Sequence, residues 1–265
     1  MEFQLKYVLA QGSPAKIKAA LSQSSLPKSL SDAYRKVMDQ MEEGQKKFAF
    51  QIMSWIFYAA RRLTIRELCE ALSVEEDSKE LQEELLPEPD SIVKACESLV
   101  EIDQNSQEVR FTHQTVDEFL RDHCTSQMLG ASGLAKTCLI YLTFSEFNRR
   151  CESDEQVIAR REKHRFLRYA ATFWGHHTRG DPEKDDNIKQ RALLLLTSEN
   201  YKNSMVQEER MDIINFLRLI SPEYPVIREQ TLLHIIAKNG LATLCKHVLA
   251  RTINGNNTYV LEFNI

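Results

Sequence analysis

Glycine and proline are both scarce in this 265-residue chain, which has 8 and 7 of them. An all-β protein would need such turn residues between many short strands, so their scarcity disfavours that class and suits helices joined by short connections. Long apolar runs are missing as well. The most apolar window, residues 48–60, is interrupted by Gln51 and Ser54, and it is shorter than the roughly 20 residues that a membrane span needs.

Signals for secretion, disulfides and metal binding are also missing. The first 16 residues have neither the basic start nor the apolar core of a signal peptide. The cysteines form no CxxC pair and follow no zinc-ligand spacing; they are Cys69, Cys96, Cys124, Cys138, Cys151 and Cys245. Each stands in an apolar helical pattern, which indicates free, buried thiols in a reducing compartment. We therefore expect a cytoplasmic protein that binds no metal and contacts no membrane.

Motifs of phosphate binding and of acyl-transfer catalysis do not occur. Without GxxxxGK[ST] the chain has no phosphate-binding loop of its own. The string nearest to the GxSxG of a hydrolase nucleophile, residues 130–133, has the wrong spacing and lies between predicted helices. We expect no catalytic residue and no cofactor held by this chain alone, and thus a protein that is not an enzyme.

The patterns that are present are mostly helical. Apolar side chains recur at helical spacing in one core helix, at Phe48, Ile52, Trp55, Ile56 and Ala59. The next helix begins with a capping box, in which Thr64 and Glu67 each accept from the other's backbone N–H.

A third helix is predicted over residues 91–98, and the apolar period then changes from helical to alternating. Residues 99–103 and 109–112 are two short strands around a turn, which predicts a hairpin. A helix resumes at His113. Three helices followed by a β-hairpin is the order of a winged-helix domain, which we place at residues 26–125.

Residues 75–90 hold eight acidic residues and one lysine, which predicts a solvated, mobile insertion. This insertion bears on an alternative function, a winged-helix nucleic-acid-binding protein. A recognition helix should present Arg or Lys to phosphates and bases, but the third helix offers only Lys94, beside Glu97. The net charge of −4 adds no attraction. We expect no nucleic-acid partner and keep DNA binding as the alternative.

Residues 126–222 are helical in period throughout and are predicted to form a linker array. Breaks are expected at 130–133, 180–182 and 221–222, where glycine or proline interrupts the pattern. A bundle and a solenoid of helix pairs would both show this period. The fold class is therefore mainly α, with a winged-helix domain, a helical linker array and a partial ankyrin repeat.

The partial repeat is predicted at residues 223–265, where TLLHIIAKNG resembles the ankyrin opening TPLHxAAxxG. The motif positions are Thr231, His234, Ala237 and Gly240. Threonine can cap the first helix, histidine can brace the loop, and glycine permits the left-handed turn between the two helices. One ankyrin unit cannot bury its own face. The repeat array is therefore cut short here, or this unit leans on the helices before it.

Four segments in order resemble the region behind the NACHT ATPase domain of fungal NOD-like (STAND) proteins. They are Leu26–Leu30 with Tyr34 (LPxxLxxxY), Arg61–Leu68 (RPLTxxEL), Val109–Leu120 (vrfvHxSvxeFL), and Phe166–Trp174 with His176 (pLlxYAaxyWxxH). The likeness spans roughly residues 20 to 180. This part of the chain is similar to the winged-helix domain named after GPI inositol-deacylase.

The resemblance implies an upstream NACHT-type ATPase in cis, with residues 1–25 as the tail of its helical subdomain. In such proteins the histidine that opens this helix contacts the β-phosphate of ADP, and His113 matches it. That role requires the ATPase; within this chain alone, His113 is expected to cap its helix or pack on the wing. The implied function is a non-catalytic signal-transduction module that couples the ATPase to an ankyrin array binding protein ligands.

Overall fold

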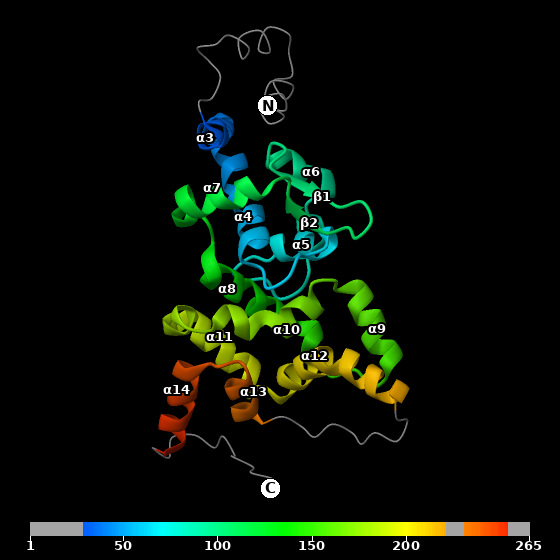
Figure 1. Ribbon diagram of the computed structural model, residues 1–265. Coiled ribbons are helices and arrows are strands. Elements are labelled where there is room, and N and C mark those ends of the chain that lie inside the picture. Colours follow the sequence, from blue (N-terminus) through cyan, green and yellow to red (C-terminus); the bar gives the residue numbers. More distant parts are fainter. Residues whose placement is uncertain (1–28, 221–230, 254–265) are drawn as a thin grey trace, which may run out of the picture.

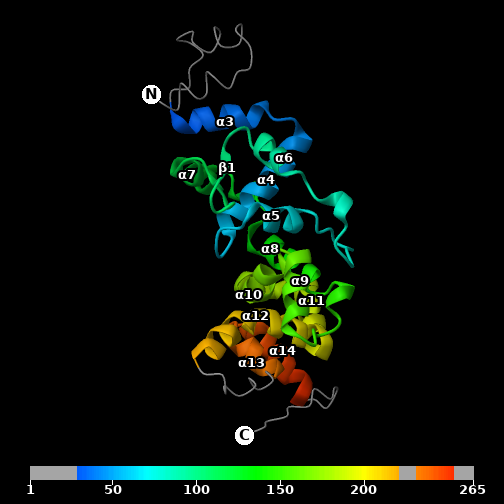
Figure 2. The same ribbon diagram turned by 90° about the vertical axis from the view of Figure 1, so that its right-hand side faces the viewer.

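The computed structural model describes residues 29–220 and 231–253, with side chains described except those of 212–220 and 251–253. The predicted ATPase tail at 1–25 lies outside the described residues, as do the break expected at 221–222 and residues 223–230 and 254–265 of the predicted repeat. A domain of short helices with a β-hairpin occupies one end, a group of helices the middle, and a helical hairpin the other end (Figures 1 and 2). The mainly α fold class is confirmed.

The first domain follows the predicted order. Its elements are α3 (Leu30–Gln40), α4 (Glu43–Tyr58), α5 (Ile65–Leu72), α6 (Pro89–Ala95), β1 (Val100–Ile102), β2 (Val109–Phe111) and α7 (Gln114–His123). The capping box is confirmed, because Thr64 Oγ1 accepts from the Glu67 N–H at 3.4 Å and Glu67 Oε2 accepts from the Thr64 N–H at 2.8 Å. These two bonds satisfy donors that would otherwise be unpaired at the start of α5.

The hairpin is antiparallel, with Val100 opposite Phe111 and Ile102 opposite Val109. A third strand-like segment completes it, which the sequence pattern did not predict. The Val109 N–H donates to Leu63 O at 2.9 Å, and the Ile65 N–H donates to Gln107 O at 2.8 Å. This segment is too short to show an alternating period, so only the pairing partner identifies it.

The third helix, α6, begins at Pro89 and ends at Ala95, earlier at both ends than the predicted 91–98. Proline is favoured in the first turn, where the missing N–H costs nothing. The early end follows from the backbone, since Glu97 and Ser98 have φ of 47° and 64°. Such left-handed residues do not continue a right-handed helix.

The middle region consists of α8 (Gly130–Leu142), α9 (Asp154–Lys163), α10 (Leu167–Thr178), α11 (Asp186–Thr197) and α12 (Glu199–Ile220). In the described part of the chain, short 3₁₀ turns lie between helices at η1 (Glu83–Leu85), η2 (Thr125–Gln127), η3 (Ser145–Phe147) and η4 (Asp181–Lys184). Helix α8 packs on both α10 and α11, and α12 packs on the same two helices. This arrangement is a bundle, which decides the alternative that periodicity left open. The break expected over 130–133 is confirmed only at its start, because α8 begins at Gly130 and Gly133 lies inside the helix.

The last described elements are α13 (Leu232–Lys238) and α14 (Ala242–Ile253), which pack on each other as a helical hairpin. One continuous apolar core extends from Tyr34 in α3 to Val248 in α14. Five of the six cysteines are buried and Cys245 is half-buried, all six as free thiols. None of the described helices combines the length and the apolar character needed to cross a membrane.

Candidate functional site

His113 stands immediately before α7 and caps it. Its Nδ1 accepts the Thr115 N–H at 3.2 Å and lies 2.8 Å from Thr115 Oγ1, while the side chain remains exposed. Because Nδ1 accepts, the proton of the neutral ring belongs on Nε2, which makes that nitrogen a hydrogen-bond donor. A donor at a helix N-terminus suits an anion, since the helix dipole adds positive potential there.

Tyr34 of α3 contacts the same first turn of α7. Its hydroxyl lies 2.6 Å from Thr115 Oγ1, and its ring lies 5.3 Å from that of Phe119 on α7. The side chain is fully buried, and burial raises the pKa of the Tyr34 hydroxyl. The two sequence segments that contain Tyr34 and His113 therefore meet in the fold, which their positions in the sequence did not reveal.

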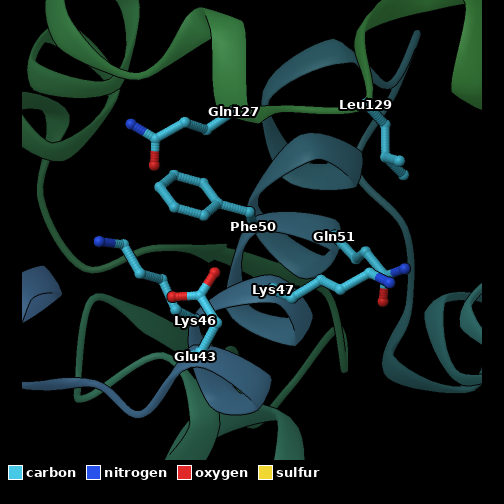
Figure 3. A pocket seen from close by; sticks show the side chains of 7 residues that line it. All are labelled: Glu43, Lys46, Lys47, Phe50, Gln51, Gln127 and Leu129. Carbon is cyan, nitrogen blue, oxygen red and sulfur yellow. The ribbon is translucent and has the colours of Figure 1, made fainter.

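A pocket of about 330 Å³ opens beside α4 in the winged-helix region (Figure 3). It lies between the first turns of α4 and the connection into α8, and is lined by Glu43, Lys46, Lys47, Phe50, Gln51, Gln127 and Leu129. None of the residues predicted from the sequence to form a site lines this pocket. We assign no chemistry to it.

The joint between the winged-helix region and the bundle is formed around Glu70 of α5, a residue that no sequence pattern predicted as functional. Its carboxylate accepts the Arg165 and Phe166 N–H groups at 2.9 and 3.0 Å, at the start of α10. The Tyr141 hydroxyl of α8 donates to it at 2.5 Å. Glu70 is 6% exposed, and burial raises the pKa of its carboxyl. The only sequence signal was a carboxylate on the apolar face of a short helix.

Aromatic side chains fill the same joint. Trp55 of α4 packs edge to face on Phe166 and Tyr169 of the bundle, with ring centroids 5.3 and 6.0 Å apart. The Ala60 N–H donates to the Tyr169 hydroxyl at 3.0 Å, and that hydroxyl lies 2.8 Å from His177 Nε2. Because the Tyr169 hydroxyl already accepts the Ala60 N–H, we assign its own proton to the bond with His177, whose Nε2 is then the acceptor. The last of the four segments on which the family resemblance rests, residues 166–176, therefore contributes side chains to this internal joint.

Protonation of His177 should therefore destabilise the fold. Burial, with a smaller contribution from His176, lowers the pKa of His177 to about 4, below the ordinary value of 6.5. The unfolded chain then binds the proton more readily than the folded chain. The stability is fully present above pH 6.5 and is lost as the pH falls toward 4. We expect a loss of about 3 kcal/mol from this group in urea unfolding.

Replacing His177 by glutamine should remove this part of the pH dependence, because the amide retains an acceptor for Tyr169 but does not titrate. His123→Gln is the matched control, since that histidine is exposed on α7, and its profile should follow the unsubstituted chain. Equal slopes for the His177→Gln and unsubstituted chains between pH 6.5 and 4 would show that His177 is not the group responsible.

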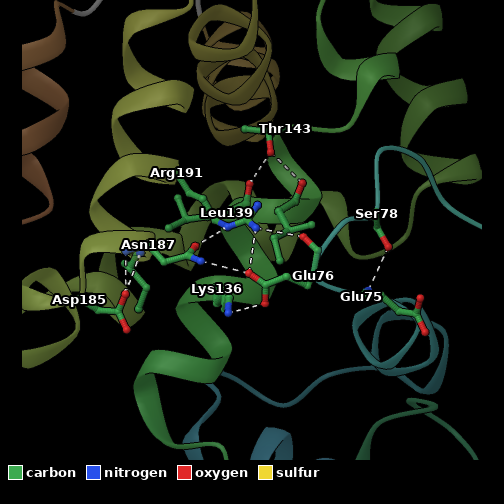
Figure 4. A network of polar contacts seen from close by, with 11 residues as sticks. Glu75, Glu76, Ser78, Lys136, Leu139, Thr143, Asp185, Asn187 and Arg191 are labelled. Carbon is green, nitrogen blue, oxygen red and sulfur yellow. Dashed lines mark hydrogen bonds and ion pairs between the residues drawn. The ribbon is translucent and has the colours of Figure 1, made fainter.

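The acidic segment at 75–90 also takes part in the joint. Glu76 forms ion pairs with Lys136 of α8 and, at 3.0 Å, with Arg191 of α11, and accepts from the Asn187 side chain (Figure 4). Lysine and arginine lower the pKa of this carboxyl. The Ser145 N–H donates to Lys79 O at 2.8 Å. The segment is largely exposed, as expected, but its start is anchored on the bundle, which the prediction of a mobile insertion did not include.

A second buried carboxylate holds the helical hairpin. Glu183 of η4 is 3% exposed, and its Oε2 accepts the Thr243 and Leu244 N–H groups at 2.8 and 3.0 Å, in the first turn of α14. Gly175 of α10 lies against Asn239, so closely that a Cβ at this glycine would be 2.1 Å from the asparagine Oδ1. The α13–α14 hairpin therefore packs on the bundle, which is one of the two alternatives left open by the sequence.

The four residues of the predicted ankyrin motif lie at the start of α13, within it, and in the turn that leads to α14. Thr231 caps α13 by accepting the His234 N–H, and the His234 Nδ1 lies 2.7 Å from Thr231 Oγ1. Gly240 has φ of 66°, in the left-handed region that the turn between α13 and α14 requires. Ala237 and His234 are exposed.

The three helices α4, α5 and α6 with the β1–β2 wing define a winged-helix domain, and residues 36–131 match the family described as "GPI inositol-deacylase, winged helix domain". The chain is also similar to "Azaphilone pigments biosynthesis cluster protein L" of Monascus ruber, with 26% identity over 171 residues, which cover 58% of this chain and 35% of that protein. The chain thus spans about a third of the length of that curated relative. No solved structure matches the chain.

Proposed function

We propose that this chain is a non-catalytic regulatory module that couples the nucleotide state of an upstream NACHT-type ATPase to an ankyrin-type array that binds protein ligands. The observation that carries the proposal is the unbroken series of buried contacts from the head of α7 to α14. A signal received at one end has a packed path to the other. The same proposal places the protein in the cytoplasm.

The head of α7 supports the nucleotide end of the coupling. His113 is exposed, and its Nε2 is the donor that a phosphate oxygen would accept from. Hydrogen bonds from a donor to an ionised phosphate are stronger than neutral ones. The ATPase would supply the remainder of the nucleotide site, so no cofactor is assigned to this chain alone.

The buried carboxylates of Glu70 and Glu183 support the proposed coupling between the winged-helix domain, the bundle and the hairpin. Glu70 connects the winged helix to α10, and Glu183 connects the bundle to α14, each by accepting two backbone N–H groups of a helix start. A hydrogen bond to a charged group contributes roughly 1.5–3 kcal/mol. Such contacts favour movement of the three parts together over independent movement.

The α13–α14 hairpin supports the proposed connection to an ankyrin array. Thr231 and Gly240 have the cap and turn geometry that an ankyrin opening needs. An ankyrin unit buries its faces by stacking on neighbouring units, so the proposed array would stack on this hairpin. The similarity to a Monascus ruber protein agrees with the fungal resemblance of the sequence segments.

Charge argues against the alternative of nucleic-acid binding. On α6 the exposed Lys94 stands among the exposed Glu88, Asp90 and Glu97. Glu97 accepts from the Gln45 side chain at 2.9 Å. A duplex phosphate approaching this helix would meet more negative than positive charge. We therefore favour protein partners over nucleic acid.

Hydrogen exchange in the parent protein, which carries the ATPase, tests the coupling. The amides of Thr243 and Leu244 should exchange at different rates in the ADP-bound and ATP-bound states, because Glu183 holds them only while the hairpin stays docked. The amides within α8 serve as the internal control and should not differ. Equal exchange of Thr243 and Leu244 in both states would show that the nucleotide signal does not reach the hairpin.

A further inference from the structure

The contacts around His113 contain more than a helix cap. Two donors converge on its Nδ1: the Thr115 N–H at 3.2 Å and the Thr115 hydroxyl at 2.8 Å. A nitrogen that accepts the backbone N–H has no proton of its own, so the hydroxyl in contact with it must be the donor. The single Thr115 hydroxyl proton is then committed to His113.

The direction of the next bond follows from this one. With its proton given to His113, Thr115 Oγ1 can only accept from the Tyr34 hydroxyl, 2.6 Å away. Tyr34 is fully buried, and its raised pKa keeps it a protonated donor. The chain of bonds runs one way, from Tyr34 through Thr115 to His113, and each bond polarises the next.

We propose that Tyr34 and Thr115 are positioning residues that hold the His113 imidazole in one orientation and in its Nε2–H tautomer, so that it meets its ligand as a hydrogen-bond donor. A ring held in this state selects ligands that accept, such as a phosphate oxygen of a nucleoside diphosphate. The Nδ1–H tautomer would place a donor against the Thr115 backbone N–H, whose direction is fixed, and would reverse the bond to the Thr115 hydroxyl. The identity of the ligand rests on the proposed function, whereas the orientation and tautomer of the ring rest on its contacts with Thr115.

Two substitutions isolate the positioning bonds. Thr115→Val keeps the size and the backbone N–H but removes the hydroxyl, and Thr115→Ser restores the hydroxyl. Tyr34→Phe keeps the ring that packs on Phe119 and removes only its hydroxyl. None of these changes removes the imidazole itself.

The first measurement is nitrogen-15 NMR of the histidine side chains in the full chain, above the pH at which imidazole protonates. A His113→Gln variant assigns the signal among the seven histidines. The unsubstituted chain should show His113 as the Nε2–H tautomer alone. Thr115→Val should produce a detectable Nδ1–H population, Thr115→Ser should not, and Tyr34→Phe should produce a smaller one. A signal unchanged by Thr115→Val would overturn the inference.

The second measurement is the ADP off-rate in the parent protein with its ATPase. Thr115→Val should raise the off-rate roughly fivefold, the equivalent of one neutral hydrogen bond, while Thr115→Ser leaves it unchanged. If the tautomer changes but ADP release does not, the positioning is correct and the nucleotide role is wrong. If His113→Ala speeds ADP release but Thr115→Val alters neither signal, the nucleotide role stands and the positioning is wrong.

Discussion

Replacing His113 by alanine should release ADP about ten to a hundred times faster from a protein in which the proposed ATPase precedes this chain. The physical reason is the loss of one hydrogen bond from Nε2 to a charged phosphate, which contributes roughly 1.5–3 kcal/mol. In the proposed function only the ADP-bound form uses this contact, so the equilibrium should shift toward the ATP-like open form. The measurement is the dissociation rate of a labelled ADP under chase.

The structure adds a second effect that the control must separate. Because His113 also caps α7, His113→Ala should cost this chain about 1 kcal/mol of unfolding free energy. His113→Ser provides the control, since serine is a good cap but cannot reach a phosphate as an imidazole does. Fast ADP release from both variants, with lost stability only in the alanine variant, is the expected pattern. If the serine variant retains ADP normally, His113 is a structural cap and nothing more.

Glu70→Ala should destabilise this chain by about 3 kcal/mol. The substitution leaves the Arg165 N–H, the Phe166 N–H and the Tyr141 hydroxyl without their acceptor inside a buried joint. Unsatisfied buried donors cost roughly 1–3 kcal/mol each, and the relief of the buried carboxylate offsets part of this cost. Denaturant unfolding measures the loss. Hydrogen exchange should show it locally, as faster exchange of the Arg165 and Phe166 amides.

Two further variants test the interpretation of this joint. Glu70→Gln keeps the volume and one acceptor oxygen, so it should cost about half as much as alanine. Glu84→Ala is the matched surface control, because Glu84 is exposed on η1, and its effect should stay within about 0.5 kcal/mol. A loss below about 1 kcal/mol for Glu70→Ala would mean that water replaces the carboxylate and that Glu70 does not hold the joint.

Local features of this protein followed from the sequence because their partners lie within a few residues. The Thr64–Glu67 capping box and the Thr231–His234 cap each span three residues. The left-handed turn at Gly240 requires only the absence of a side chain. Caps and turns depend on backbone groups that any nearby chain supplies, so a residue pattern is enough to predict them.

The limits of the pattern appear where a helix end or a strand depends on distant residues. The strand-like segment at Leu63 exists because Val109 donates to it from 46 positions away along the chain. Gly133 was expected to lie in a break between helices, yet it lies within α8, whose buried face packs on α10 and α11. Packing outweighs the roughly 1 kcal/mol by which glycine disfavours a helix.

The sequence by itself determined the helical class, the wing and the position of His113 at the head of its helix. Only the tertiary structure decided which carboxylates hold the joints and what holds His113. Tyr34 lies 81 residues from Thr115, Glu70 lies 95 from Arg165, and Glu183 lies 60 from Thr243. The sequence does not distinguish a glutamate or tyrosine at an exposed position from one at a buried position. Its role depends on which distant donors share its low-dielectric surroundings, and folding alone brings those donors together.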